Sequence, residues 1–257
     1  MRLQVWIGAM VVATVVTAAA FAPQLATHNP MRSSINFLQG PSSEHYFGTD
    51  ELGRDVYSRV LHGAKISLIV GIGAAVVATL IGVPIGLLAG YRGGKVDLFV
   101  VQLIDLFIAL PGLVLALIIT VMIGVSIDKL MIVLGFVTWP VVARLVRGQV
   151  MNIRESLFVE AARALGGRAM WIVWTHILPN ILRVIAAQFS ITVSLAIFTS
   201  ASLSFLGLGI PPPTPDWGGM VRAGFDFLSI NPLISLAPGG AVAVTVFGFY
   251  LMGSTIE

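Results

Sequence analysis

Apolar residues gather into six long runs along this chain, separated by shorter polar stretches. Each run is close to the ~20 residues that an α-helix needs to cross a bilayer. The pattern therefore predicts six transmembrane helices, at 3–23, 66–90, 98–123, 129–149, 183–206 and 236–253. Proline stands inside three of these runs, at Pro84, Pro111 and Pro140. Membrane helices tolerate proline where neighbours satisfy the freed carbonyl group, so we expect kinks at these positions.

The first run also has features of a signal peptide. Its end, residues 18–22, has the small-residue composition of a cleavage site. However, an apolar stretch of about 20 residues is longer than the roughly 7–15 of a signal-peptide core, and only Arg2 precedes it. We therefore expect a retained helix.

The distribution of basic residues predicts the orientation. Arg92 and Lys95 lie in 91–97 and six arginines lie in 144–183, whereas 124–128 has no basic residue and 207–235 has only Arg222. Cytoplasmic loops of membrane proteins carry an excess of Lys and Arg. The segments 91–97 and 150–182 are thus expected in the cytoplasm, with both termini beside them and the 24–65 loop outside.

That outer loop carries a helix signal of its own. Thr49-Asp50 is typical of a helix start, and Gly63 of a helix stop. Leu52, Val56 and Val60 recur every four residues and would form one apolar face. A short amphipathic helix at the membrane surface and an ordinary loop helix packed on the bundle both fit this pattern. We accordingly expect two units, 1–65 (first span and outer loop) and 66–257 (a five-helix core).

The second span carries a ladder of small residues. Ala74, Ala78, Gly82, Gly86 and Gly90 follow one another at intervals of four and share one helix face. Small residues let two helix backbones approach closely in lipid. The face either slides and gates against a neighbour or packs statically, and we favour static packing.

Composition removes several classes of function. Hydrophobic residues make up 57% of the chain and charged residues 11%, which suits a lipid environment, and no basic run suggests a nucleic-acid partner. There is no cysteine, the four histidines form no ligand pair in sequence, and no catalytic or nucleotide-binding motif occurs, so neither a metal site nor an enzyme is expected. Asp105 is the one carboxylate clearly within an apolar run. It is either a proton or cation site or, as we favour, a residue that bonds an adjacent helix or reaches the interface.

The segment 151–180 is too long and too patterned for a plain connection. Residues 155–165 favour a helix, Gly166-Gly167 breaks it, 168–178 favours a second helix, and Pro179 is expected to stop that one. Such a bend at the membrane surface is either a docking site for another chain or an interfacial hairpin. Any ATP-driven activity would need a separate ATPase chain, because no Walker motif is present.

This segment resembles the EAA loop of ABC importer permeases. The resemblance rests on Glu160-Ala161-Ala162, Gly166, Ile172, His176 and Leu178-Pro179-Asn180. Two further stretches are similar to the dipeptide, oligopeptide and nickel permease group: Gly48-Thr49-Asp50 with Gly53-Arg54-Asp55, and residues 203–209 followed by Pro212-Pro213 and Trp217-Gly218.

The resemblance implies an all-α transmembrane protein with the six-helix type I ABC importer permease fold and cytoplasmic coupling helices. It implies a multi-pass subunit of a prokaryotic plasma (inner) membrane importer that moves di- or oligopeptides. The partners would be a second homologous permease, two cytoplasmic ATPase subunits and an extracytoplasmic binding protein, with ATP and Mg on the ATPases and no cofactor in this chain. Nickel chelates or glutathione are the alternative cargo, and an ion-coupled secondary transporter is the competing class.

The resemblance, read with the patterns above, assigns candidate residues to three places. ATPase coupling falls to Glu160, Ala161, Ala162, Ala164, Leu165, Gly166 and Arg168. Helix packing or gating falls to Ala78, Gly82, Gly86, Asp105 and Pro111. The outer loop and gate region comprise Asp50, Arg54, Asp55, Ser204, Phe205, Gly207 and Trp217.

Overall fold

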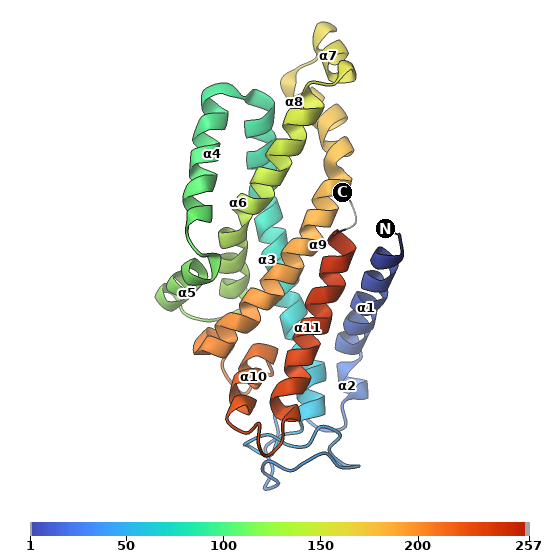
Figure 1. Ribbon diagram of the computed structural model, residues 1–257, viewed down its shortest axis with the longest axis vertical. Helices are drawn as coiled ribbons and strands as arrows, with labels where there is room; N and C mark the ends of the chain where they lie inside the picture. Colours follow the sequence, from blue (N-terminus) through green and yellow to red (C-terminus); the bar gives the residue numbers. More distant parts are fainter. Residues whose placement is uncertain (1, 255–257) are drawn as a thin grey trace.

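The protein is an elongated bundle of helices (Figure 1). The computed structural model describes residues 2–254, and within that range the extended backbone is limited to one isolated bridge between Thr49 and Asp55. The elements are α1 (Arg2–Ala20), α2 (Ala22–Leu25), α3 (Val56–Arg92), α4 (Gly94–Ala109), α5 (Gly112–Ile123), α6 (Ile127–Arg154), α7 (Leu157–Ala164), α8 (Ala169–Ile172), the π-helix η1 (Val173–Ile177), α9 (Leu178–Leu203), the π-helix η2 (Ser204–Leu208), α10 (Trp217–Phe225) and α11 (Leu233–Gly253).

Two structurally different regions occupy the ends of the long axis (Figure 1). One, which we call the α7 end, carries α7 and α8 between the long helices α6 and α9. The other, the loop end, carries the irregular segment 27–55. The first turn of α1 and the last turn of α11 both lie on the part of their helix that is nearer the α7 end. The start of α1 and the end of α11 therefore point in the same direction along the bundle.

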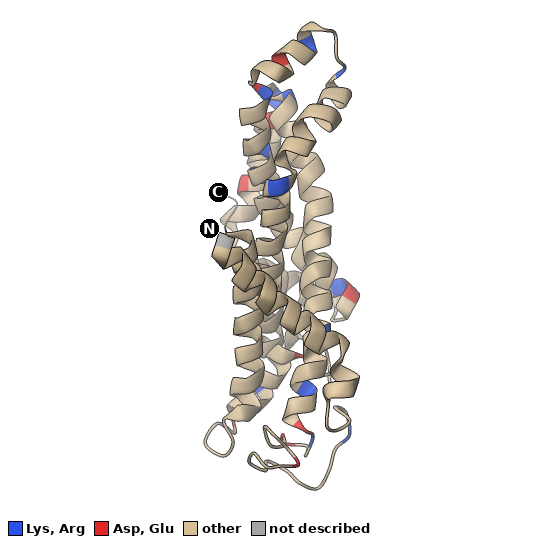
Figure 2. Ribbon diagram, turned by 90° about the vertical axis from the view of Figure 1, so that its right-hand side faces the viewer, with Lys and Arg blue, Asp and Glu red and all other residues tan. Residues whose placement is uncertain are grey.

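Among the described residues, five helices are long and apolar enough to cross a membrane, and a sixth span exists if the bent pair α4–α5 is counted as one. The two halves of that pair meet at 84°. The break falls at Leu110-Pro111, where Pro111 becomes the N-cap of α5, so the expected kink is a full interruption. Figure 2 shows long stretches of helix without a charged residue, as a lipid-facing bundle requires.

The small-residue ladder of α3 packs against α6. A Cβ on Gly82 would lie 2.8 Å from the carbonyl oxygen of Trp139, and one on Gly86 would lie 2.6 Å from that of Ala143. Ala78 is fully buried in the same contact region. Only glycine at these two positions allows the two backbones to come this close, so the ladder is a packing face of the bundle.

Two expected helix ends are absent. The helix predicted to begin near Asp50 begins at Val56, with Asp55 as its N-cap, and it continues through Gly63 as part of the span. Gly63 is needed for another reason: a Cβ there would lie 2.8 Å from the indole ring of Trp217. Pro179 does not end a helix either: it stands near the start of α9, directly after the π-helix η1 (Val173–Ile177).

Candidate functional site

Helix α7 is a short helix closed by glycine. Gly166 has a φ of 82°, which is a left-handed conformation that glycine adopts without steric cost. The N–H groups of Gly166 and Gly167 donate to the carbonyl oxygens of Arg163 (2.9 Å) and Ala162 (3.0 Å). These bonds satisfy the last carbonyls of the helix and turn the chain toward α8. The predicted helix–glycine–helix bend is confirmed.

Two faces of α7 differ in their surroundings. Val159 and Ala162 are buried, whereas Leu165 is 90% exposed. The remaining predicted coupling residues are also exposed: Glu160, Ala161, Ala164, Gly166 and Arg168. Ala162 is the exception to the expectation of a partner-facing surface, because its methyl group lies inside this chain. Bulky apolar side chains flank the exposed face, namely Leu157, Phe158, Met170, Trp171 and Trp174.

Buried apolar side chains connect α7 to the long helices. We call them the α7 cluster: Val146 and Val150 of α6, Val159 and Ala162 of α7, Ile172 of α8, Ile177 of η1 and Ile181 of α9. Ile172 and Ile177 are fully buried. A displacement of α7 would therefore be transmitted to α6 and α9, since packed interiors transmit strain.

A π-helix joins α8 to α9 without interruption. Proline cannot donate an N–H group to the carbonyl four residues earlier, and its ring needs extra room. The wider turn at Val173–Ile177, immediately before Leu178-Pro179, gives that room. Asn180 Nδ2 also donates to the His176 carbonyl oxygen, at 2.6 Å. Helix α8, η1 and α9 thus form one continuous helical unit.

Two ion pairs link α4 to α6. Asp105 pairs with Arg144, and Asp97 pairs with Arg147, whose Nη2 donates to Asp97 Oδ2 at 2.6 Å. The preference for Asp105 as a bond to an adjacent helix is thus confirmed. Asp97 and Arg147 did not appear among the candidates. The sequence spacing could have predicted these ion pairs. Asp97 and Asp105 share one face of α4, and Arg144 and Arg147 share one face of α6.

At the loop end, a buried carboxylate holds two arginines. Asp50 Oδ2 lies 2.7 Å from Arg54 Nε and 3.5 Å from Arg59 Nε, and all three side chains are almost completely buried. Arg59 Nη1 also donates to the carbonyl oxygens of Pro30 (2.9 Å) and Pro213 (3.3 Å). This arrangement fixes the outer loop to the start of α3 and to the segment before α10.

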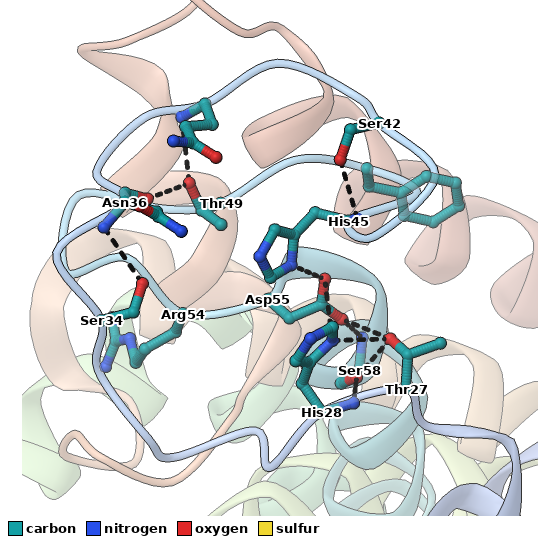
Figure 3. A network of polar contacts seen from close by, with 12 residues as sticks. Thr27, His28, Ser34, Asn36, Ser42, His45, Thr49, Arg54, Asp55 and Ser58 are labelled. Carbon is teal, nitrogen blue, oxygen red and sulfur yellow. Dashed lines mark hydrogen bonds and ion pairs between the residues drawn. The ribbon is translucent and has the colours of Figure 1, made fainter.

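Asp55 organises a second network, shown in Figure 3. Its Oδ2 accepts a hydrogen bond from the Ser58 N–H group at 2.8 Å, which caps α3, and another from Thr27 Oγ1 at 3.3 Å. Its Oδ1 lies 2.9 Å from His45 Nδ1. The His28 and His45 rings lie 4.5 Å apart. The expectation that no two histidines form a close pair is wrong here, because the irregular loop folds back on itself and brings distant residues together.

A cavity of about 560 Å³ lies between the outer loop, α3, η2 and α10. Of the predicted outer and gate residues, Asp50, Arg54, Ser204 and Gly207 line it. The other three lie elsewhere: Asp55 caps α3, Phe205 packs edge-on against Phe225, and Trp217 is buried and donates its indole N–H to the Val60 carbonyl oxygen at 2.9 Å. The cavity also contains charged residues that were not among the candidates: Glu51, Arg59, Asp216, Arg222 and Asp226.

Asp216 is the most deeply buried acid of this cavity that has no ion-pair partner among the described residues. Its Oδ2 accepts a hydrogen bond from the Gly219 N–H group at 3.0 Å and so caps α10. Burial raises the pKa of the Asp216 carboxyl above its ordinary value, and the Ser204 hydroxyl and the Gly219 amide oppose that shift. The contribution of Asp216 to the free energy of unfolding is therefore expected to depend on pH.

Comparison with known proteins agrees with this geometry. Residues 82–256 match the family described as "Binding-protein-dependent transport system inner membrane component". The dipeptide transport system permease protein DppC of Alkalihalophilus pseudofirmus is 38% identical over 98% of this chain and 83% of its own. The oligopeptide transport system permease protein OppC of Bacillus subtilis is 35% identical over the same shares. The glutathione transport system permease protein GsiD of Pectobacterium atrosepticum is 38% identical over 85% of this chain and 73% of its own.

A solved structure supports the fold. An inward-facing structure of the MetNI methionine ABC transporter superimposes with a TM-score of 0.63 and 22% identity, over 77% of this chain and 94% of that one. The type I importer fold, expected from the resemblance of 160–180, is thereby confirmed. With the family match over 175 residues and relatives that align almost end to end, the chain belongs to the inner-membrane components of binding-protein-dependent transport systems.

Proposed function

We propose that this chain is one of two permease subunits of an ATP-driven importer of di- and oligopeptides. A second, homologous permease would complete the translocation path. Two ATPase subunits, which hold ATP and Mg, would dock at the α7 end, and an extracytoplasmic binding protein would deliver the peptide at the loop end. This chain would contribute no catalytic residue and no cofactor.

One observation carries the proposal: α7 exposes one face and is fixed by its other face. The exposed side offers Glu160, Ala161 and Leu165 to another chain, while Val159 and Ala162 anchor the helix in the α7 cluster. A surface that only lay on lipid headgroups would not need to be connected to α6 and α9. This connection lets ATP binding in a partner shift the bundle between two states, which is the requirement for coupled transport.

The proposed orientation places the α7 end in the cytoplasm. Six basic residues of the segment 144–183 lie there or on the adjoining helices, and the excess of Lys and Arg favours the cytoplasmic side. Helices α1 and α11 have their terminal ends toward the α7 end, so both termini would be cytoplasmic as well.

The proposed cargo follows from the relatives and from the outer cavity. Relatives named for dipeptide, oligopeptide and glutathione transport align along most of the chain. The cavity is lined by the basic Arg222 and by the acidic Glu51 and Asp226, which suits a peptide with a charged amine and a charged carboxylate. Glutathione, a tripeptide with the same two kinds of group, is the second candidate.

Reconstitution would test the proposal. The chain is purified with its co-purifying subunits, placed in proteoliposomes with the binding protein, and assayed for ATP-dependent uptake of a labelled dipeptide and of glutathione. Leu165→Ala removes an exposed side chain at the proposed contact and should lower ATPase association at least about fivefold with unchanged thermal stability. Ile172→Ala removes a buried anchor and should leave ATPase bound while transport per ATP falls.

A matched control is Leu80→Ala, since Leu80 of α3 is also highly exposed but lies far from α7. It should behave as wild type in every assay. If ATP drives the uptake of neither peptide, the proposed cargo is wrong. Wild-type ATPase association in Leu165→Ala, or full transport by the chain without any ATPase, would refute the coupling role.

A further inference from the structure

A group of metal-binding side chains lies at the loop end, away from the α7 cluster and outside the charged cavity. His28 follows α2, and Glu44 and His45 lie in the middle of the outer loop. One ligand atom from each of the three residues falls within 4.8 Å of the others. We propose that these residues form a Zn²⁺ site on the outer loop, with water as the fourth ligand.

Hydrogen bonds around the two rings decide which nitrogens are available. A carboxylate oxygen only accepts, so the His45 Nδ1 that lies 2.9 Å from Asp55 Oδ1 must carry the hydrogen. The Thr27 hydroxyl uses its one hydrogen on Asp55 Oδ2, at 3.3 Å. Its oxygen therefore accepts from His28 Nδ1, at 3.0 Å. Both rings are thus protonated on Nδ1, and both keep a lone pair on Nε2.

This is the arrangement that metal sites use. A histidine that binds a metal usually donates its other N–H group to a carboxylate or another oxygen, which fixes the tautomer and the ring orientation. Here Asp55 orients His45 directly and His28 through Thr27, as Figure 3 shows. Neither Nε2 has a hydrogen-bond partner among residues 2–254, so the lone pairs are free for a ligand.

Donor type and spacing favour zinc. Two imidazole nitrogens and one carboxylate oxygen are a common set for Zn²⁺, whose ligands at 2.0–2.1 Å in a tetrahedron lie about 3.3 Å apart. The three residues each bring a ligand atom to within 4.8 Å of the others, and the exposed Glu44 side chain is free to turn toward the two rings when an ion binds. The carboxylates of Glu44 and the buried Asp55 together balance the two positive charges of the ion. Arg32, which lines the same hollow, adds a further positive charge nearby.

The site is open to the outside through a hollow of about 490 Å³. Asn29, Arg32, Ser33 and Ser34 line this hollow together with His28, Glu44 and His45. It gives an ion and its water ligand a path to the site. Bound there, zinc would join the end of α2, the middle of the outer loop and, through Asp55, the start of α3. The ion would therefore stabilise the fold of the loop end.

Zinc binding to the full chain tests the proposal. The protein is placed in lipid nanodiscs with its co-purifying subunits retained, stripped with chelator, titrated with Zn²⁺ alone, and analysed for metal content and melting temperature. Wild type should bind one Zn²⁺ per chain more than His28→Ala and should melt higher with Zn²⁺ than without it. Glu44→Gln, a change at an exposed side chain that leaves the fold intact, should weaken binding at least about tenfold.

His62→Ala is the matched control, because His62 Nδ1 bonds the Ser58 carbonyl oxygen and takes no part in the group. It should bind zinc as wild type does. Co²⁺ in place of Zn²⁺ should give the intense visible absorption of a tetrahedral site in wild type and lose it in His28→Ala. Equal zinc content in wild type and His28→Ala, or an equal loss in His62→Ala and His28→Ala, would overturn the proposal.

Discussion

The two ends of the molecule are stabilised by different interactions. At the loop end, buried charges carry the structure: Asp50 holds Arg54 and Arg59, and Asp55 holds Thr27 and His45. At the α7 end, apolar burial in the α7 cluster does so, and apolar side chains remain exposed on the opposite face. The loop end pairs these buried charges within the chain, whereas the α7 end keeps an exposed apolar surface that another chain can cover. Substitutions of charged residues should therefore lower the free energy of unfolding much more at the loop end than at the α7 end.

The largest expected effect is at the buried carboxylate of the loop end. Asp50→Ala leaves the Arg54 and Arg59 guanidinium groups buried without their shared partner. Removing one partner of a buried ion pair costs about 3–5 kcal/mol, so the free energy of unfolding in mixed micelles should fall by that amount.

The matched change at the other end is Glu155→Ala. Glu155 lies 3.7 Å from Arg154, but its side chain is 76% exposed. Exposed ion pairs contribute at most about 1 kcal/mol, and the loss should be smaller than that. Equal losses in the two variants would show that the contrast between the ends is wrong.

The two ends also differ in how much of their structure could be predicted from the sequence. At the α7 end, the left-handed Gly166 and the helix before it follow from local signals, which act over a few residues. The continuous path through Pro179 did not follow from local signals, because proline is a helix stop in most contexts and here a π-helix precedes it.

At the loop end, most of the structure depends on contacts between distant residues. Gly63 signals a helix stop locally, yet it accommodates Trp217, which comes from the other half of the chain. His28 and His45 meet only because the loop folds over the start of α3. An irregular segment has no periodicity that reports its partners. The α4–α6 ion pairs, by contrast, lie on regular helices and left a readable spacing.

A smaller effect is expected at the glycine that ends α7. Gly166→Ala and Gly148→Ala both add a methyl group into open space, but only Gly166 has a positive φ. Alanine in the left-handed region costs about 1–2 kcal/mol, whereas alanine within the helix α6 gains up to about 1 kcal/mol. Amide hydrogen exchange in α7 should therefore accelerate in Gly166→Ala and stay unchanged in Gly148→Ala. Faster exchange in both variants would mean that the added methyl group, and not the backbone angle, is responsible.

The smallest expected effect concerns pH, and it belongs to the loop end. Burial raises the pKa of Asp216, so the folded protein still holds a proton over a pH range in which the unfolded chain has released it. The contribution of Asp216 to stability is thus fully present at acidic pH and is lost as the pH rises through its raised pKa. Asp216→Asn keeps an acceptor for the Gly219 N–H group and carries no charge.

The melting temperature of Asp216→Asn relative to wild type should accordingly rise between about pH 4, near the ordinary pKa of aspartate, and neutral pH. Asp226→Asn is the control, because Asp226 lines the same cavity but is exposed. A gap between Asp216→Asn and wild type that stays constant across this range would mean that Asp216 is charged throughout. The hydrogen bond that it accepts from the Gly219 N–H group would then outweigh its burial, and the loop end would hold a third stabilised buried carboxylate beside Asp50 and Asp55.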